Sequence, residues 1–127
     1  MREMRPDDDK LEAVATNLRN ALVAALKVIA WPHSPEVGEW RDDSYMSRLA
    51  AARVAEEIAH PRRLSGIHVH VLYASARRRL DQVHRNARAL DPQSPEGRPP
   101  QPLPDTCTAT LRQLLDTTDL ALLIAMP

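Results

Sequence analysis

The sequence predicts an all-α fold, a single helical domain over residues 1–127 in which four helices form a bundle. The chain contains no Phe, two Trp and two Tyr, although hydrophobic residues make up 43% of it, so Leu, Val, Ile and Ala must build the core. Ala and Leu rank high in helix propensity. Only three glycines are present, which is few for the tight turns of β-hairpins. A chain of 127 residues also suits one hydrophobic core.

The first expected helix covers about residues 8–30. Pro6 and the three aspartates after it favour a helix start, because carboxylates accept the free N–H groups of a first turn. Apolar residues then recur at spacings of three and four until Trp31-Pro32, which ends the pattern. The apolar stripe consists of Leu11, Val14, Leu18, Leu22, Ala25 and Ile29.

A connection over residues 32–43 and a second helix over about 44–59 follow. The connection holds two prolines and a glycine, and one short helical turn in it would bring Val37 and Trp40 into the core. Ser44 or the two aspartates before it would cap the second helix. This helix should end before Pro61, since the residue preceding a proline avoids the α region.

The third expected helix covers about residues 64–90. Residues 67–73 alternate apolar and polar and read locally as a strand, an alternative that stays open. The longer window favours a helix, because its apolar residues are spaced four, three, four and three apart and form a seam along one side. The seam consists of Val69, Tyr73, Ala76, Leu80, Val83, Ala87 and Leu90.

Residues 91–104 contain six prolines and should form an extended arm rather than a helix. Asp105 or Thr106 would then cap a last helix over about 105–125, with Thr117-Thr118 as its weak point. The end of this helix is so apolar that it must be buried against the other helices or against a second subunit. Its apolar face consists of Leu111, Leu114, Leu115, Leu122 and Met126.

The composition excludes several protein classes. A single cysteine, Cys107, allows neither an intramolecular disulfide nor a two-cysteine metal knuckle. No run of about 18 apolar residues is present, and the N-terminus lacks the apolar region of a signal peptide. We therefore expect a cytoplasmic protein with no membrane segment, no cofactor and no metal.

Arg79 and His84 are five residues apart in the third helix, an Arg-x4-His pattern. This pattern resembles the signature of the HEPN ribonucleases, helical dimers in which Arg and His from each subunit meet at a shared cleft. The resemblance implies that His84 would act in acid–base transfer on the ribose hydroxyl or leaving oxygen and that Arg79 would stabilise the negative charge of the phosphorane. The alternative is a solvated Arg79, with His84 beside the apolar seam.

Basic residues are concentrated in the middle of the chain, where residues 48–90 carry nine basic and three acidic side chains. Much of this set can line one side of the third helix, as in helices that contact phosphates. The alternative is a solvated face that is neutralised by the acidic flanks. The candidate nucleic-acid-binding residues are Arg62, Arg63, Arg77, Arg78, Arg85 and Arg88.

These observations favour a small, non-enzymatic interaction protein that self-associates, as a dimer, through the seam of the third helix or the apolar end of the last one, and binds a protein partner. The alternative function is nucleic-acid binding, with or without ribonuclease activity at Arg79 and His84.

Overall fold

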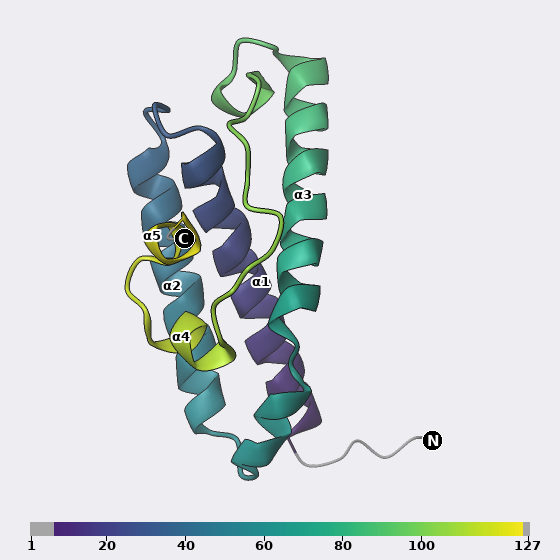
Figure 1. Ribbon diagram of the computed structural model, residues 1–127, viewed down its shortest axis with the longest axis vertical. Coiled ribbons are helices and arrows are strands. Elements are labelled where there is room, and N and C mark those ends of the chain that lie inside the picture. Colours follow the sequence, from purple (N-terminus) through teal and green to yellow (C-terminus); the bar gives the residue numbers. More distant parts are fainter. Residues whose placement is uncertain (1–6, 126–127) are drawn as a thin grey trace.

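The computed structural model describes residues 7–125, and it is all-helical, with no strand in that range. Three long helices, α1 (Asp8–Ala30), α2 (Val37–Glu56) and α3 (Val69–Leu90), run up, down and up (Figure 1). α1 packs against both of the others and lies at the centre of the protein. The short helices α4 (Leu111–Asp116) and α5 (Leu120–Ala125) pack against α2, and α5 also contacts α1.

α1 matches the predicted range of 8–30 and supplies most of the core. Val14, Leu18 and Leu22 of the predicted stripe are completely buried. By length and mean hydropathy α1 could also cross a membrane, although half of its most apolar 18-residue window is buried within the protein. Core helices of water-soluble proteins have the same character.

The start of α1 differs from the prediction. Pro6 lies outside the described residues, and the side chain of Asp7 makes no capping bond. It instead accepts a hydrogen bond from the backbone N–H of His60 at 3.1 Å, which ties the α2–α3 connection to the start of α1. Asp7 adopts a left-handed backbone conformation with φ of 73°.

α2 begins at Val37 and ends at Glu56, so the predicted range of 44–59 was wrong at both ends. The connection is shorter than expected because Trp40, which is 5% exposed, packs into the core from the first turn of the helix. Ser44 is therefore not a cap but a buried residue of the helix interior. Its hydroxyl donates to the carbonyl oxygen of Ala21 in α1 at 2.9 Å.

α3 begins at Val69 rather than at the predicted 64, because a 3-10 helix, η1 (Pro61–Gly66), precedes it. Residues 69–73 are helical, so the strand alternative for 67–73 was wrong. The centre of the seam, formed by Tyr73, Ala76 and Leu80, is buried, whereas Leu90 at its end is 88% exposed.

The proline-rich arm is extended as predicted, apart from the short 3-10 helix η2 (Pro95–Gly97). It descends beside α1 and α3 (Figure 1). Hydrogen bonds to α1 and α3 hold it there. Trp31 Nε1 donates to the carbonyl oxygen of Arg98 at 2.9 Å, and the N–H of Gln101 donates to the carbonyl oxygen of Ala30 at 2.8 Å. The Tyr73 hydroxyl donates to the carbonyl oxygen of Pro104.

The predicted helix over 105–125 was wrong, and a bundle of four long helices is not confirmed. Residues 105–110 are not helical, and α4 starts only where Thr110 and Gln113 form a capping box. Thr117 is extended and ends α4 at the weak point that the sequence predicted. Met126 lies outside the described residues. Arg48 of α2 holds α4 in place, because its Nη1 donates to the carbonyl oxygen of Leu115 at 2.6 Å.

Candidate functional site

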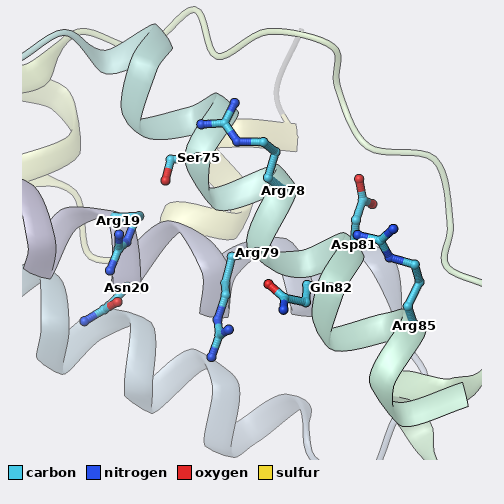
Figure 2. Close-up of a pocket in the computed structure, with 8 residues that line it drawn as sticks. All are labelled: Arg19, Asn20, Ser75, Arg78, Arg79, Asp81, Gln82 and Arg85. Carbon is cyan, nitrogen blue, oxygen red and sulfur yellow. The ribbon is translucent and has the colours of Figure 1, made fainter. Parts of the chain in front are cut away.

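A groove of about 640 Å³ lies between α1 and α3, and every side chain that lines it is polar or charged (Figure 2). We call it the arginine groove. Its lining consists of Arg19 and Asn20 of α1 and of Ser75, Arg78, Arg79, Asp81, Gln82 and Arg85 of α3.

The helical repeat of α3 creates this groove. Ser75, Arg79 and Gln82 recur at spacings of four and three, so they share a face of the helix. That face adjoins the buried seam, which packs α3 onto the core. Polar residues at the edge of this packed face therefore lie next to α1, where Arg19 meets them (Figure 2).

The groove carries an excess of positive charge. It contains four arginines and one carboxylate, that of Asp81. Within residues 7–125, none of the four arginines is in an ion pair. The ion pairs of the described chain lie elsewhere: Arg41 with Asp119, Arg63 with Asp8, Arg77 with Asp105, and Arg112 with Asp116. The groove arginines are all exposed and thus able to contact an anion.

The structure divides the basic residues that the sequence grouped together. Arg78, Arg79 and Arg85 line the groove. Arg77 turns toward the end of the arm, where its Nη1 donates to the carbonyl oxygen of Asp105 at 3.1 Å, and Arg63 pairs with Asp8. Arg62 and Arg88 are exposed but do not line the groove.

Arg19 is the groove arginine that the sequence analysis did not identify. It is a single exposed arginine on α1, and the local pattern of α1 gives it no distinguishing feature. Only the packing of α3 on α1 brings Arg19 beside Arg78 and Arg79.

Arg79 and His84 point to different surroundings. Five residues on a helix correspond to a rotation of about 140°. Arg79 lines the groove, whereas Nδ1 of His84 lies 2.7 Å from the carbonyl oxygen of Glu96 in the arm, and its ring lies 6.0 Å from that of Trp31. One chain therefore does not bring the two side chains together.

The chain matches no known protein family, no curated protein and no solved structure. Its function must therefore be inferred from the residues themselves.

The surface expected for self-association is largely internal. The middle of the α3 seam packs inside its own chain, where Leu80 is 2% exposed. Near the C-terminal end, Leu120, Ala121 and Ile124 are buried too, while Leu122 is 63% exposed. The apolar residues that the sequence assigned to a second subunit are thus mostly used within one chain.

Glu36 and Cys107 are among the titratable groups outside the groove whose pKa values are shifted. Partial burial, together with a hydrogen bond to Glu96 and repulsion from its charge, raises the pKa of Glu36 above its ordinary value, and Lys27 partly opposes this. Burial likewise raises the pKa of the Cys107 thiol, which makes it a weak nucleophile.

Proposed function

We propose that the protein binds nucleic acid, with backbone phosphates held by the arginine groove. The observation that carries this proposal is the convergence of four exposed arginines, without ion pairs in the described chain, from α1 and α3 onto one groove. Guanidinium groups bind phosphate oxygens through paired hydrogen bonds, and they remain charged at every physiological pH.

The proposal is one of binding rather than cleavage. No histidine is among the residues that line the groove, and its one carboxylate, Asp81, is exposed. Proton transfer in a HEPN-like reaction would require His84, whose ring lies against the arm and Trp31 and does not line the groove. The groove supplies positive charge and hydrogen-bond donors, which are sufficient for binding phosphates.

Salt dependence provides the test. Each phosphate contact releases a counterion, so four contacts predict that log K falls with log salt concentration with a slope of about −3 to −4. We would measure the fluorescence anisotropy of a labelled oligonucleotide over a range of salt concentrations. Replacement of Arg78 and Arg85 by Ala should reduce the magnitude of the slope by about 1.5 and weaken binding.

The matched control replaces Arg62 and Arg88 by Ala. It removes the same charge from exposed positions outside the groove, and it should change affinity much less. Absence of binding at low salt would refute the proposal. If the groove variant and the control variant lose the same affinity for the oligonucleotide, the groove is not the binding site.

As a second candidate function, we propose self-association or partner binding through the C-terminal end, because Leu122 remains 63% exposed there. Light scattering of the wild type and of Leu122→Glu tests it. A monomeric wild type that captures no partner contradicts this candidate and leaves the first one standing.

A further inference from the structure

A second hollow, whose wall unlike that of the arginine groove includes apolar side chains, lies beside that groove. This α2 hollow has a volume of about 360 Å³ and lies between α1 and α2. Asn20 and Arg79 line both spaces, so the two are adjacent. Figure 2 shows Arg79 extending from α3 across α1 in the direction of α2. The other residues of the α2 hollow are Val23, Ala24, Lys27, Trp40, Asp43, Met46 and Ser47.

Apolar side chains form part of the wall of the α2 hollow. Val23 and Ala24 contribute from α1, and Met46 contributes from α2 with 59% of its surface exposed. Exposure of so much of a large apolar side chain is unfavourable in water, and a flat apolar ligand lying on it would recover that free energy. The thioether of methionine also makes favourable contacts with aromatic rings.

Polar groups surround these apolar side chains. Asp43 is in no ion pair within the described residues, and its carboxylate can accept a hydrogen bond from an exocyclic amino group such as N4 of cytosine. Ser47 and Asn20 add further hydrogen-bonding groups. Two cationic side chains also line the α2 hollow: Lys27, whose Nζ lies 5.7 Å from the centre of the Trp40 ring, and Arg79, which lines the arginine groove as well.

An anion site beside a hollow whose wall combines apolar and polar side chains matches the chemistry of a nucleotide. The phosphate is the charged part, and the base is a flat apolar ring whose edges carry donors and acceptors. Arg79, at the junction, can bind a phosphate or stack its guanidinium plane on the base. A paired base is not available to such a hollow, because flipping it out of a duplex costs a few kcal/mol.

Resting on the proposed function, we infer that the protein prefers single-stranded nucleic acid, with phosphates in the arginine groove and one unpaired base in the α2 hollow against Met46. A duplex, or a polyanion that has no bases, would bind to the arginine groove alone. The preference should therefore depend on the α2 hollow, whereas binding as such depends on the arginines.

The experiment compares three probes at one salt concentration: a single strand of about ten nucleotides, a hairpin duplex with the same number of phosphates, and inorganic polyphosphate. DNA and RNA versions of the strand are both tested, and a preference for the single strand in either supports the inference. We expect the single strand to bind about tenfold more tightly than the duplex. Met46→Ala should remove most of this difference without changing polyphosphate binding, while Arg78→Ala should weaken all three.

Leu90→Ala serves as the control, because it also truncates an exposed large apolar residue but lines neither the arginine groove nor the α2 hollow. Since Met46 and Leu90 are both exposed, both variants should fold. Duplex binding as tight as single-strand binding, or a preference that survives Met46→Ala, overturns this inference and leaves nucleic-acid binding intact. If none of the three probes binds, the proposed function itself fails.

Discussion

Replacement of Leu80 by Ala tests whether the α3 seam belongs to the core of one chain. Leu80 is 2% exposed, and truncation of a buried leucine costs about 3 kcal/mol of unfolding free energy. Unfolding entropy for 127 residues is about 0.27 kcal/mol per kelvin. The expected fall in Tm is therefore about 11 °C, measured by circular dichroism.

Leu90→Ala is the matched control, because the seven-residue pattern places Leu90 in the same seam while the structure leaves it 88% exposed. Leu90→Ala should change the unfolding free energy by no more than about 0.5 kcal/mol, which corresponds to about 2 °C in Tm. Both shifts should be independent of protein concentration, since a seam shared between two chains would make Tm rise with concentration. Equal losses from Leu80→Ala and Leu90→Ala, or a shift that depends on concentration, would refute the assignment of the seam to one chain.

Three further predictions concern the arm, α2 and the thiol. Because the pKa of Glu36 is raised, its carboxyl group contributes to stability below the ordinary pKa of 4.5, and this contribution is lost as pH rises through the folded-state pKa. Glu36→Gln should therefore raise Tm at pH 7 but not at pH 3. An equal gain at both pH values would contradict the repulsion between Glu36 and Glu96. Gly97→Ala should lower the unfolding free energy by about 1–3 kcal/mol, because the added Cβ collides with the backbone carbonyl oxygen of Asp91. Gly38→Ala should instead raise the unfolding free energy by about 0.5–1 kcal/mol, because Gly38 lies in α2 with open space around it and alanine has the higher helix propensity. Urea denaturation measures both changes, and a loss at Gly38 as large as that at Gly97 would count against the collision. Cys107 should react with iodoacetamide more slowly in the native protein than in urea, since burial raises its pKa; equal rates would show that the thiol is not protected.

Local periodicity predicted each of the three long helices and gave the full range of α1, but it did not give the starts of α2 and α3. The stripe from Leu11 to Ile29 predicted the whole of α1, and the seam predicted the C-terminal end of α3 at Leu90. These patterns are informative because each helix buries one continuous face. The start of α2 was missed because Pro35 and Gly38 suggested a connection, while the burial of Trp40 favoured helix from Val37 onward.

The C-terminal segment shows what periodicity could not predict. Thr110-x-x-Gln113 is a readable capping box that marks the start of α4, but the leucines on either side of Thr117 suggested one continuous helix. Hydrogen bonds from distant residues position these short helices. One of them, from Arg48 to Leu115, joins residues 67 positions apart, and no local pattern reports such a contact.

The candidate site also depends on contacts between distant residues, which the local sequence does not report. The sequence identified Arg78, Arg79 and Arg85 as members of a basic face, and these three line the groove. It did not identify Arg19, because that contact depends on which side of α1 receives α3. Nor did it separate Arg77, whose hydrogen bond to Asp105 depends on the path of the arm.

The arm also has a consequence for the order of folding. α1 and α2 are neighbours in the chain, whereas the bond from Trp31 to Arg98 spans 67 residues. Because contacts between distant residues form late, we expect α1 and α2 to pair before the arm docks. During that interval the hydroxyl of Tyr73 lacks its acceptor, and a second chain can supply an arm in place of its own. At high concentration, refolding should therefore yield a fraction of dimers that have exchanged residues 91–125, an exchange that slow refolding of dilute protein avoids.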